Sequence, residues 1–92
     1  MTNREQFLKK HKLPKDTSLS LMEISKLSGF PLTALRLVYN KGIGAAKTTG
    51  ITRPEVTSPE QWAMGRVYAF VMKTKPVFYG SDRHIAEMYN LI

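Results

Sequence analysis

The sequence predicts an all-α protein: a compact, mostly helical domain of four or five helices that contains a helix-turn-helix. Two kinds of observation predict it. Ser20 with Glu23, and Ser58 with Gln61, have the Ser-x-x-Glu/Gln spacing of a capping box, which marks the start of a helix. Apolar residues follow both starts at helical spacing. The 92 residues, 42% of them hydrophobic, are typical of one globular domain over residues 1–92.

The first element is a short helix over residues 2–12, with Asn3 as its N-cap. Phe7 and Leu8 are its only bulky apolar residues. Pro14 then breaks the helical pattern. A basic run surrounds this break, and it consists of Lys9, Lys10, His11, Lys12 and Lys15.

Residues 20–42 are the most regular stretch. The first of its two helices begins at the Ser20 capping box and ends at Gly29, which is free to adopt the left-handed conformation. Its apolar residues recur at helical spacing: Leu21, Ile24 and Leu27.

Pro31 suits the first turn of a second helix, and we expect Gly42 to end it. Its apolar face consists of Leu32, Leu35, Val38 and Tyr39. Two short helices joined by a turn of three or four residues have the helix-turn-helix pattern.

Residues 43–57 are rich in Gly, Thr and Pro, and they predict a loop with a short strand over 49–53. The helix that begins at Ser58 is apolar nearly all round, which predicts burial on several sides and places Trp62 in the core. Gly65 costs this helix about 1 kcal/mol relative to alanine, so we expect another backbone to approach it closely. The main apolar stripe contains Ala63, Val67 and Phe70.

Residues 74–80 interrupt the helical pattern. We expect Ser81 to cap a last helix, with Asp82 at the positive end of its dipole. The inward face of that helix would contain Ile85, Met88, Tyr89 and Ile92.

Composition excludes several function classes. The chain has no cysteine, which excludes disulfides, thiolate metal sites and a cysteine nucleophile. His11 and His84 lie far apart in sequence and no carboxylate is spaced to join them, so we expect no metal and no cofactor. The N-terminus has no apolar segment of a secretory signal, and no apolar run approaches the roughly 20 residues of a membrane span.

The net charge of +7 favours polyanionic partners, nucleic acid before an anionic membrane surface. No catalytic constellation accompanies it. Ser81, Asp82 and His84 lie within one helical turn, whereas a nucleophile, its base and an orienting group must converge from positions that a fold encloses. We therefore predict a protein that is not an enzyme and has no small-molecule substrate.

The glycine-rich segment YNKGIGAAKTTG resembles a phosphate-binding loop in composition. A Walker A loop reads G-x-x-x-x-G-K-[ST] and connects a strand to a helix. Here Gly42 is followed by IGAAKT, so the lysine comes one residue early, lacks its preceding glycine and follows a helix. The segment is better interpreted as a turn after Gly42, with Gly44 allowing a tight continuation.

The second helix of a helix-turn-helix lies in the major groove of DNA. Candidate nucleic-acid contacts on it are Thr33, Arg36, Asn40 and Lys41, which we expect to face away from the core together with Ala34 and Leu37. Arg36 suits guanine, and Asn40 suits adenine or a phosphate oxygen. The alternative is a solvated face with Arg36 in a surface ion pair, and Leu37 on that face suggests a protein contact.

Phosphate contacts are also expected outside this helix. Lys47, Thr48 and Arg53 in the loop, and Lys9, Lys10 and Lys12 near the N-terminus, are the further candidates. The alternative for both groups is a solvated surface. For Arg66 a structural role is favoured over a contact with nucleic acid, with a half-buried side chain bonded to helix-end carbonyls or to a carboxylate such as Glu23 or Glu87.

Two family resemblances rest on these residues. The stretch LMEISKLSGFPLTALRLVYNKGIG resembles the N-terminal helix-turn-helix of mercury-resistance-type regulators, which implies DNA binding by its second helix. The matching residues are Ile24, Leu27, Gly29, Thr33, Leu35, Arg36, Tyr39 and Gly42. The 92 residues contain no counterpart of the long coiled-coil dimerisation helix of those regulators.

A longer resemblance is to a small domain of uncharacterised function found in large DNA viruses and some tailed phages. That domain joins a Y-N-[KR]-G-I-G-A segment to an E-Q-W-A-x-A-R-V-Y-S-F helix. Residues 39–45 match the first segment, and most of residues 60–70 match the second, except that Gly65 and Ala69 replace Ala and Ser. The resemblance implies a viral or phage source and brings no established activity.

The combined expectation is a small basic viral or phage protein of helix-turn-helix type. It would bind nucleic acid, mainly duplex DNA through phosphate contacts, in the cytoplasm of an infected host cell or in association with the virion, and it would have no membrane partner. The alternative is a protein-interaction module, either a structural component of the virion or an adaptor that binds a host protein.

Overall fold

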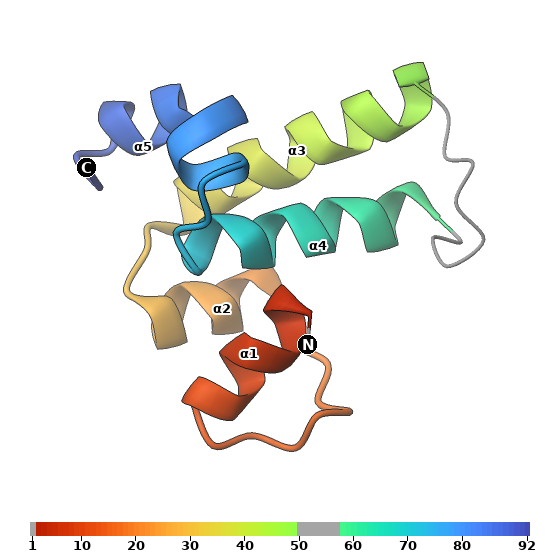
Figure 1. Ribbon diagram of the computed structural model, residues 1–92, viewed down its shortest axis with the longest axis vertical. Helices are drawn as coiled ribbons and strands as arrows, with labels where there is room; N and C mark the ends of the chain where they lie inside the picture. Colours follow the sequence, from red (N-terminus) through yellow and green to blue (C-terminus); the bar gives the residue numbers. More distant parts are fainter. Residues whose placement is uncertain (1, 50–57) are drawn as a thin grey trace.

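Two long antiparallel helices form the centre of the molecule, with shorter helices on either side of them (Figure 1). The computed structural model describes residues 2–49 and 58–92, with the side chains of 2–46 and 58–92. The central pair is α3 (Leu32–Thr49) and α4 (Pro59–Val71). Within the described residues the chain is mostly helical and has no strand, which confirms the all-α class for them.

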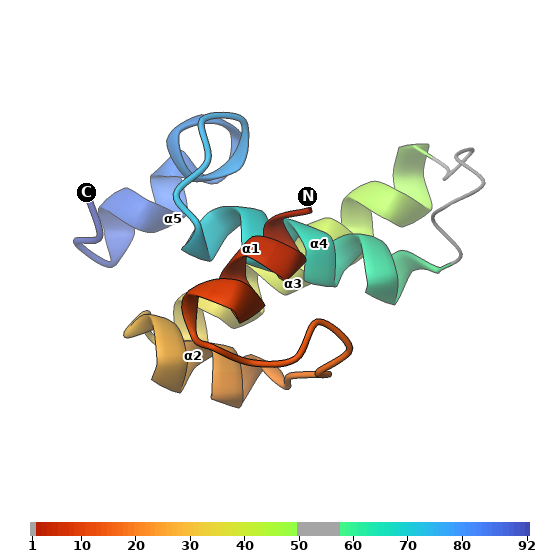
Figure 2. The same ribbon diagram turned by 60° about the horizontal axis from the view of Figure 1, so that its bottom comes forward.

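The shorter elements cover the central pair from two sides. α1 and α2 lie on one side, where α1 packs on α4 and α2 packs on α3. The π-helical segment η1 and α5 lie on the other, and the view in Figure 2 shows the same arrangement. Their bounds are Asn3–Lys10 for α1, Leu21–Ser28 for α2, Val77–Ser81 for η1 and Arg83–Met88 for α5. No helix among residues 2–49 and 58–92 has both the length and the apolarity to cross a membrane.

The predicted start of α2 is confirmed in detail. Ser20 Oγ accepts the Glu23 N–H at 3.2 Å, and Glu23 Oε1 accepts the Ser20 N–H at 3.0 Å. The hydrogen bonds from the Ser20 backbone and hydroxyl lower the pKa of Glu23. At the start of α4, Ser58 Oγ accepts the Gln61 N–H at 3.1 Å, so this predicted start is confirmed too.

Two predicted caps are wrong. α1 is capped by Thr2, whose Oγ1 accepts the Glu5 N–H at 3.1 Å, and Asn3 is already the first helical residue. α5 has no side-chain cap, because Asp82 at its N-cap position is bonded elsewhere. Ser81 belongs to η1 and not to the start of α5.

Four of the described helices are followed by a residue in the left-handed conformation, and only one of these four residues is a glycine. Gly29 has a φ of 78° after α2, as predicted. Lys12, Lys73 and Asn90 take the same conformation after α1, α4 and α5, with φ of 58°, 56° and 57°. After α4 the Thr74 N–H bonds the Ala69 carbonyl at 3.1 Å, the long bond of a Schellman motif. Sequence reasoning looked for glycine at such ends and missed the two lysines.

The predicted end of the second helix at Gly42 is wrong, because α3 continues through Gly42 to Thr49. Gly42 is buried, and a Cβ atom placed on it would lie 2.8 Å from Ala63 Cα and 3.0 Å from Ala63 Cβ. Its absence of a side chain therefore lets the α3 and α4 backbones approach each other. Residues 43–49 are helical and not a loop, and the rest of the predicted loop and strand lies outside the described residues.

The close approach expected at Gly65 is also wrong, since a Cβ atom there would have no neighbour within 4 Å. The predicted burial of several other residues is also wrong. Ala34, expected to face outwards, is fully buried, whereas Trp62, expected in the core, is 39% exposed. On the last helix Ile85 is buried as predicted, but Met88 is exposed.

A cluster of three phenylalanines joins the two sides of the core. Phe30 from the α2–α3 turn, Phe70 from α4 and Phe78 from η1 have ring centroids 5.1 to 6.0 Å apart. Phe70 and Phe78 are fully buried. The buried rings fix η1 against the end of α4, where the sequence had predicted only a break.

Candidate nucleic-acid interface

The outer face of α3 carries three of the predicted contacts. Thr33, Arg36 and Asn40 are exposed, and Leu37 on the same face is 38% exposed. The helical period turns Leu35 and other residues of α3 into the core. Arg36 forms no ion pair with a described residue. Its guanidinium is therefore available to a ligand in this part of the structure.

Lys41, the fourth predicted contact on α3, is engaged within the protein. Its Nζ lies 3.0 Å from Asp82 Oδ1, 3.2 Å from the Ser81 carbonyl oxygen and 3.4 Å from His84 Nε2. The structure therefore groups Lys41 with the end of η1 and not with the outward face of α3.

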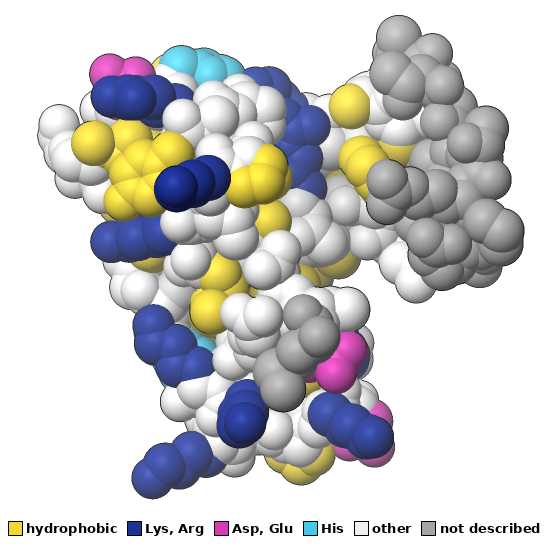
Figure 3. Space-filling view, viewed as in Figure 1, with side chains coloured by type: hydrophobic (Ala, Val, Ile, Leu, Met, Phe, Trp, Pro, Cys, Tyr) yellow, Lys and Arg dark blue, Asp and Glu magenta, His cyan; other side chains and the backbone are white. Residues whose placement is uncertain are grey.

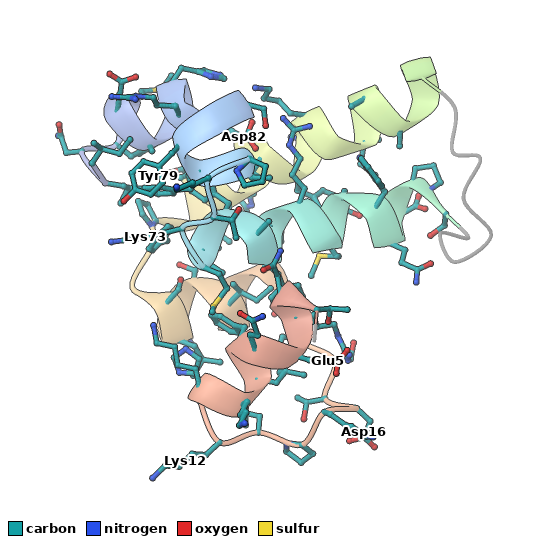
Figure 4. All side chains as sticks on the ribbon, viewed as in Figure 1. Glu5, Lys12, Asp16, Lys73, Tyr79 and Asp82 are labelled. Carbon is teal, nitrogen blue, oxygen red and sulfur yellow. The ribbon has the colours of Figure 1, made fainter. Side chains whose placement is uncertain are left out.

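Asp82 is the buried centre of an ion cluster whose two cations are partly exposed (Figure 4). Its side chain is 0% exposed, and Arg66 holds it with two hydrogen bonds of 2.8 Å, from Nε to Oδ2 and from the terminal nitrogen to Oδ1. A half-buried Arg66 paired with a carboxylate was predicted, but the partner is Asp82 and neither Glu23 nor Glu87. This geometry is the strong bidentate form of an arginine–carboxylate contact.

The two cations around Asp82 decide its charge state. Burial by itself would raise the pKa of the Asp82 carboxyl, but the hydrogen bonds from Arg66 and Lys41 outweigh burial and hold that pKa below its usual value. The hydrogen bond to Asp82 likewise raises the pKa of Arg66. Because Lys41 comes from α3 and Arg66 from α4, the cluster ties both central helices to the junction of η1 and α5.

The N-terminal lysines lie elsewhere. Lys9, Lys10 and Lys12 are exposed at the end of α1, and α1 packs on α4. In Figure 1, α4 lies between α1 and α3, and Lys10 borders a groove with Ser28 and Phe30 at the α2–α3 turn and not with Thr33, Arg36 or Asn40.

The side chains of three predicted phosphate contacts in residues 43–57 lie outside the described part of the structure. Lys47 and Thr48 belong to the last turn of α3, and their side chains lie outside the described part. Arg53 lies outside the described residues altogether.

Exposed cations without an acidic partner are the main electrostatic feature. Among the described residues, those that are exposed and form no ion pair are Lys9, Lys10, Lys12, Lys15, Lys26, Arg36, Lys73 and Lys75. Figure 3 shows Lys and Arg side chains one below another along one edge, from the η1 end to the α1–α2 end. In Figure 4, Lys73 and Lys12 lie towards that edge, and Glu5 and Asp16 lie towards the other.

A groove of about 360 Å³ lies between α4 and η1, and sequence reasoning missed it. Its lining is mostly apolar and includes Trp62, Gly65, Ala69 and Val77, with the Arg66 side chain at its polar side. The missing side chain of Gly65 keeps it open. A glycine in mid-helix was the signal in the sequence, but it marks an open surface and not a helix contact.

Residues 2–86 match the family of unknown function DUF5824. The chain belongs to this family. The DUF5824 match covers every described helix except the end of α5. No curated protein and no solved structure matches the chain.

DUF5824 membership brings no activity, so the chemistry of this DUF5824 chain follows from its own residues. Within residues 2–49 and 58–92, no three histidine, aspartate or glutamate side chains gather in a group that could hold a metal ion. What the described surface offers is unpaired positive charge, an outward polar face on α3 and exposed aromatic rings.

Proposed function

We propose that the protein binds nucleic acid, mainly duplex DNA through its phosphates, with α2 and α3 acting as a helix-turn-helix. The observation that carries this proposal is the set of exposed lysines and arginines that have no acidic partner among the described residues. Neutralising phosphates with such side chains releases counterions, which supplies most of non-specific DNA affinity.

The outer face of α3 is the proposed contact with the bases. α2 and α3 are consecutive helices joined by residues 29–31 and packed on each other. In a helix-turn-helix, the N-terminal part of the second helix contacts base edges. Thr33, Arg36 and Asn40 occupy that part of α3 and are exposed. The resemblance to a domain of large DNA viruses and phages supports a role in regulation, genome packaging or host takeover.

The proposal is tested by the fluorescence anisotropy of a labelled random-sequence duplex at about 50 and 200 mM salt. Wild type is compared with the triple variant Thr33→Ala/Arg36→Ala/Asn40→Ala. Lys15→Ala is the control, because it removes the same single charge from an exposed site away from α3.

We expect wild-type binding that weakens steeply with salt, because phosphate contacts dominate it. The triple variant should bind several-fold more weakly, because it loses the whole outer face of α3, and Lys15→Ala should lose clearly less, because it removes one exposed cation among several. No binding at the lower salt concentration, or equal binding by the triple variant, would contradict the proposal.

The second candidate, a protein-interaction module, is favoured by the apolar groove beside Trp62. Trp62 is the single tryptophan of the chain and is 39% exposed, so its emission reports on this groove directly. Duplex DNA should raise the anisotropy of the label without shifting Trp62 emission. A shift of the emission without DNA binding, on addition of a protein partner, would favour the second candidate.

A further inference from the structure

Two lysines that lie far apart in the sequence line one groove. Lys10 from the end of α1 and Lys73 from the end of α4 border a hollow of about 330 Å³. His11 and Ser28 add polar groups to it, and apolar side chains, Phe30 among them, complete its lining. The volume lies at the lower end of the range of ligand sites, roughly 300–1,000 Å³.

An exposed aromatic ring lies on η1, near Lys73 in the view of Figure 4. Tyr79 on η1 is 47% exposed, and its ring meets that of Phe78 at 4.9 Å and 81°. Phe78 is fully buried and so provides a fixed support. Phe78 contacts the Tyr79 ring in this T-shaped arrangement, and about half of Tyr79 remains open to solvent.

The turn that carries Lys73 and Lys75 is held against the backbone of η1. The Tyr79 N–H bonds the Thr74 carbonyl at 3.3 Å, and a Cβ atom on Gly80 would lie only 2.9 Å from the Lys75 carbonyl oxygen. Positive charge and the exposed ring therefore belong to one rigid unit.

Lys73 occupies a place where glycine is usually favoured. Its φ is 56°, a conformation that lysine adopts only at a cost in energy. From there its Nζ lies 5.8 Å from the centre of the Phe78 ring, the same ring that Tyr79 contacts. Figure 4 shows Lys73 and Tyr79 close together on one edge of the molecule. Neither Lys73 nor Lys75 forms an ion pair with a described residue.

We propose that Tyr79 and the groove between Lys10 and Lys73 form a site for single-stranded nucleic acid. An unpaired base would stack on Tyr79, and the lysines would bind the flanking phosphates. Stacking on an exposed ring beside a positively charged groove is the general mode of single-strand binding. A duplex keeps its bases stacked inside, so it has no base to offer to Tyr79.

This site goes beyond the proposed function because it joins α1, the end of α2, α4 and η1 and uses none of the exposed residues of α3. It also gives a place to Lys10, which the sequence had assigned to the phosphate contacts near the N-terminus. The basic edge in Figure 3 continues from this groove towards Lys12 at the α1–α2 end.

The test is an anisotropy titration of a labelled oligothymidylate of roughly 12 nucleotides, a length within the usual range of single-strand sites. Tyr79→Ala should weaken binding about tenfold, as expected for the loss of one base stack, and Tyr79→Phe should bind like wild type. Trp62→Ala serves as the control, since it removes an exposed ring outside this groove.

A charge-matched pair tests the groove itself. Lys10→Ala/Lys73→Gly should weaken oligothymidylate binding more than Lys15→Ala/Arg36→Ala, although both remove two exposed cations. Glycine is chosen at position 73 because it accepts the left-handed φ, so the turn is preserved. An equal loss of oligothymidylate affinity in the two double variants would contradict the role of the groove as the binding site.

Each outcome separates this inference from the proposed function. Unchanged oligothymidylate binding by Tyr79→Ala overturns the single-strand site, even if duplex binding still depends on Arg36. Tyr79-dependent binding of the oligonucleotide without any duplex binding supports this site and contradicts the proposed function. Tyr79-dependent binding of an oligoglutamate peptide, with none of the oligothymidylate, would overturn the nucleic-acid ligand in favour of an acidic protein.

Discussion

Gly42 and Gly65 lie within the two central helices, and their surroundings are opposite. At Gly42 the α4 backbone is so close that a Cβ atom would lie 2.8 Å from Ala63 Cα. At Gly65 a Cβ atom would meet nothing within 4 Å. The first glycine is required by the contact between α3 and α4, whereas the second leaves a groove open on the outer side of α4.

The charged residues divide in the same way. On the inner side Lys41 and Arg66 share the buried Asp82 and hold α3, α4 and the η1–α5 junction together. On the outer side Arg36 and Lys73 have no acidic partner among the described residues. The difference shows that net charge alone does not say which cations are available to a ligand.

Among the contacts of the inner side, the ion cluster of Asp82 with Lys41 and Arg66 should cost the most stability when it is broken. Asp82→Asn removes the buried carboxylate and leaves Arg66 half-buried without its partner, so we expect a loss of about 3–5 kcal/mol in the free energy of unfolding. Urea denaturation measures it. Glu87→Gln is the control, because the exposed Arg83–Glu87 pair at 3.7 Å should contribute little. Equal stability of the two variants would show that the cluster does not hold the fold.

Acid should weaken the same contact. The pKa of Asp82 is lower in the folded protein than in the unfolded chain, so its contribution is complete above the unfolded pKa of about 3.9 and is lost as the pH falls through the folded pKa. We therefore expect the stability of wild type to decrease below about pH 4. Asp82→Asn should lose less over that range, and parallel curves for the two proteins would contradict this assignment.

Gly42→Ala should be the next largest effect. Overpacking costs about 1–3 kcal/mol, and alanine regains about 1 kcal/mol of helix propensity. The nearest atom is a backbone carbon of Ala63, which cannot rotate away, so the cost lies in the upper part of that range and we expect a net loss of up to about 2 kcal/mol. Thermal unfolding followed by circular dichroism measures it. An unchanged melting temperature would mean that the two backbones are further apart than described.

Gly65→Ala should change the free energy of unfolding least, and in the opposite direction to Gly42→Ala. Alanine there gains up to about 1 kcal/mol of helix propensity and meets no neighbour. We expect a melting temperature at or slightly above that of wild type, with unchanged DNA binding. A lower melting temperature would place a contact at Gly65 that the described residues do not provide.

Much of the fold could be predicted from local signals. The capping box at Ser20, the start of α4 at Ser58 and the left-handed Gly29 depend only on nearby residues, and all three are confirmed. The extent of α3 could not be predicted, because the sequence alone does not distinguish a glycine that ends a helix from a glycine that packs against another helix. Only the position of Ala63 in space decides between them.

The candidate site was predictable in part for the same reason. Helical periodicity turns Thr33, Arg36 and Asn40 outwards, as the structure places them. The pairing of Arg66 with Asp82 joins residues from two elements, and no local pattern fixes it. The groove beside Lys73 was missed because it needs the ends of α1 and α4 to meet.

The most direct test of this account is a titration of the isotope-labelled protein with duplex DNA, followed by NMR chemical shifts. The account predicts the largest shifts at the exposed residues Thr33, Arg36 and Asn40, and small shifts at the buried contact of Gly42 with Ala63. Shifts that are confined to the buried contact, or that leave α3 unchanged while DNA binds, would contradict it.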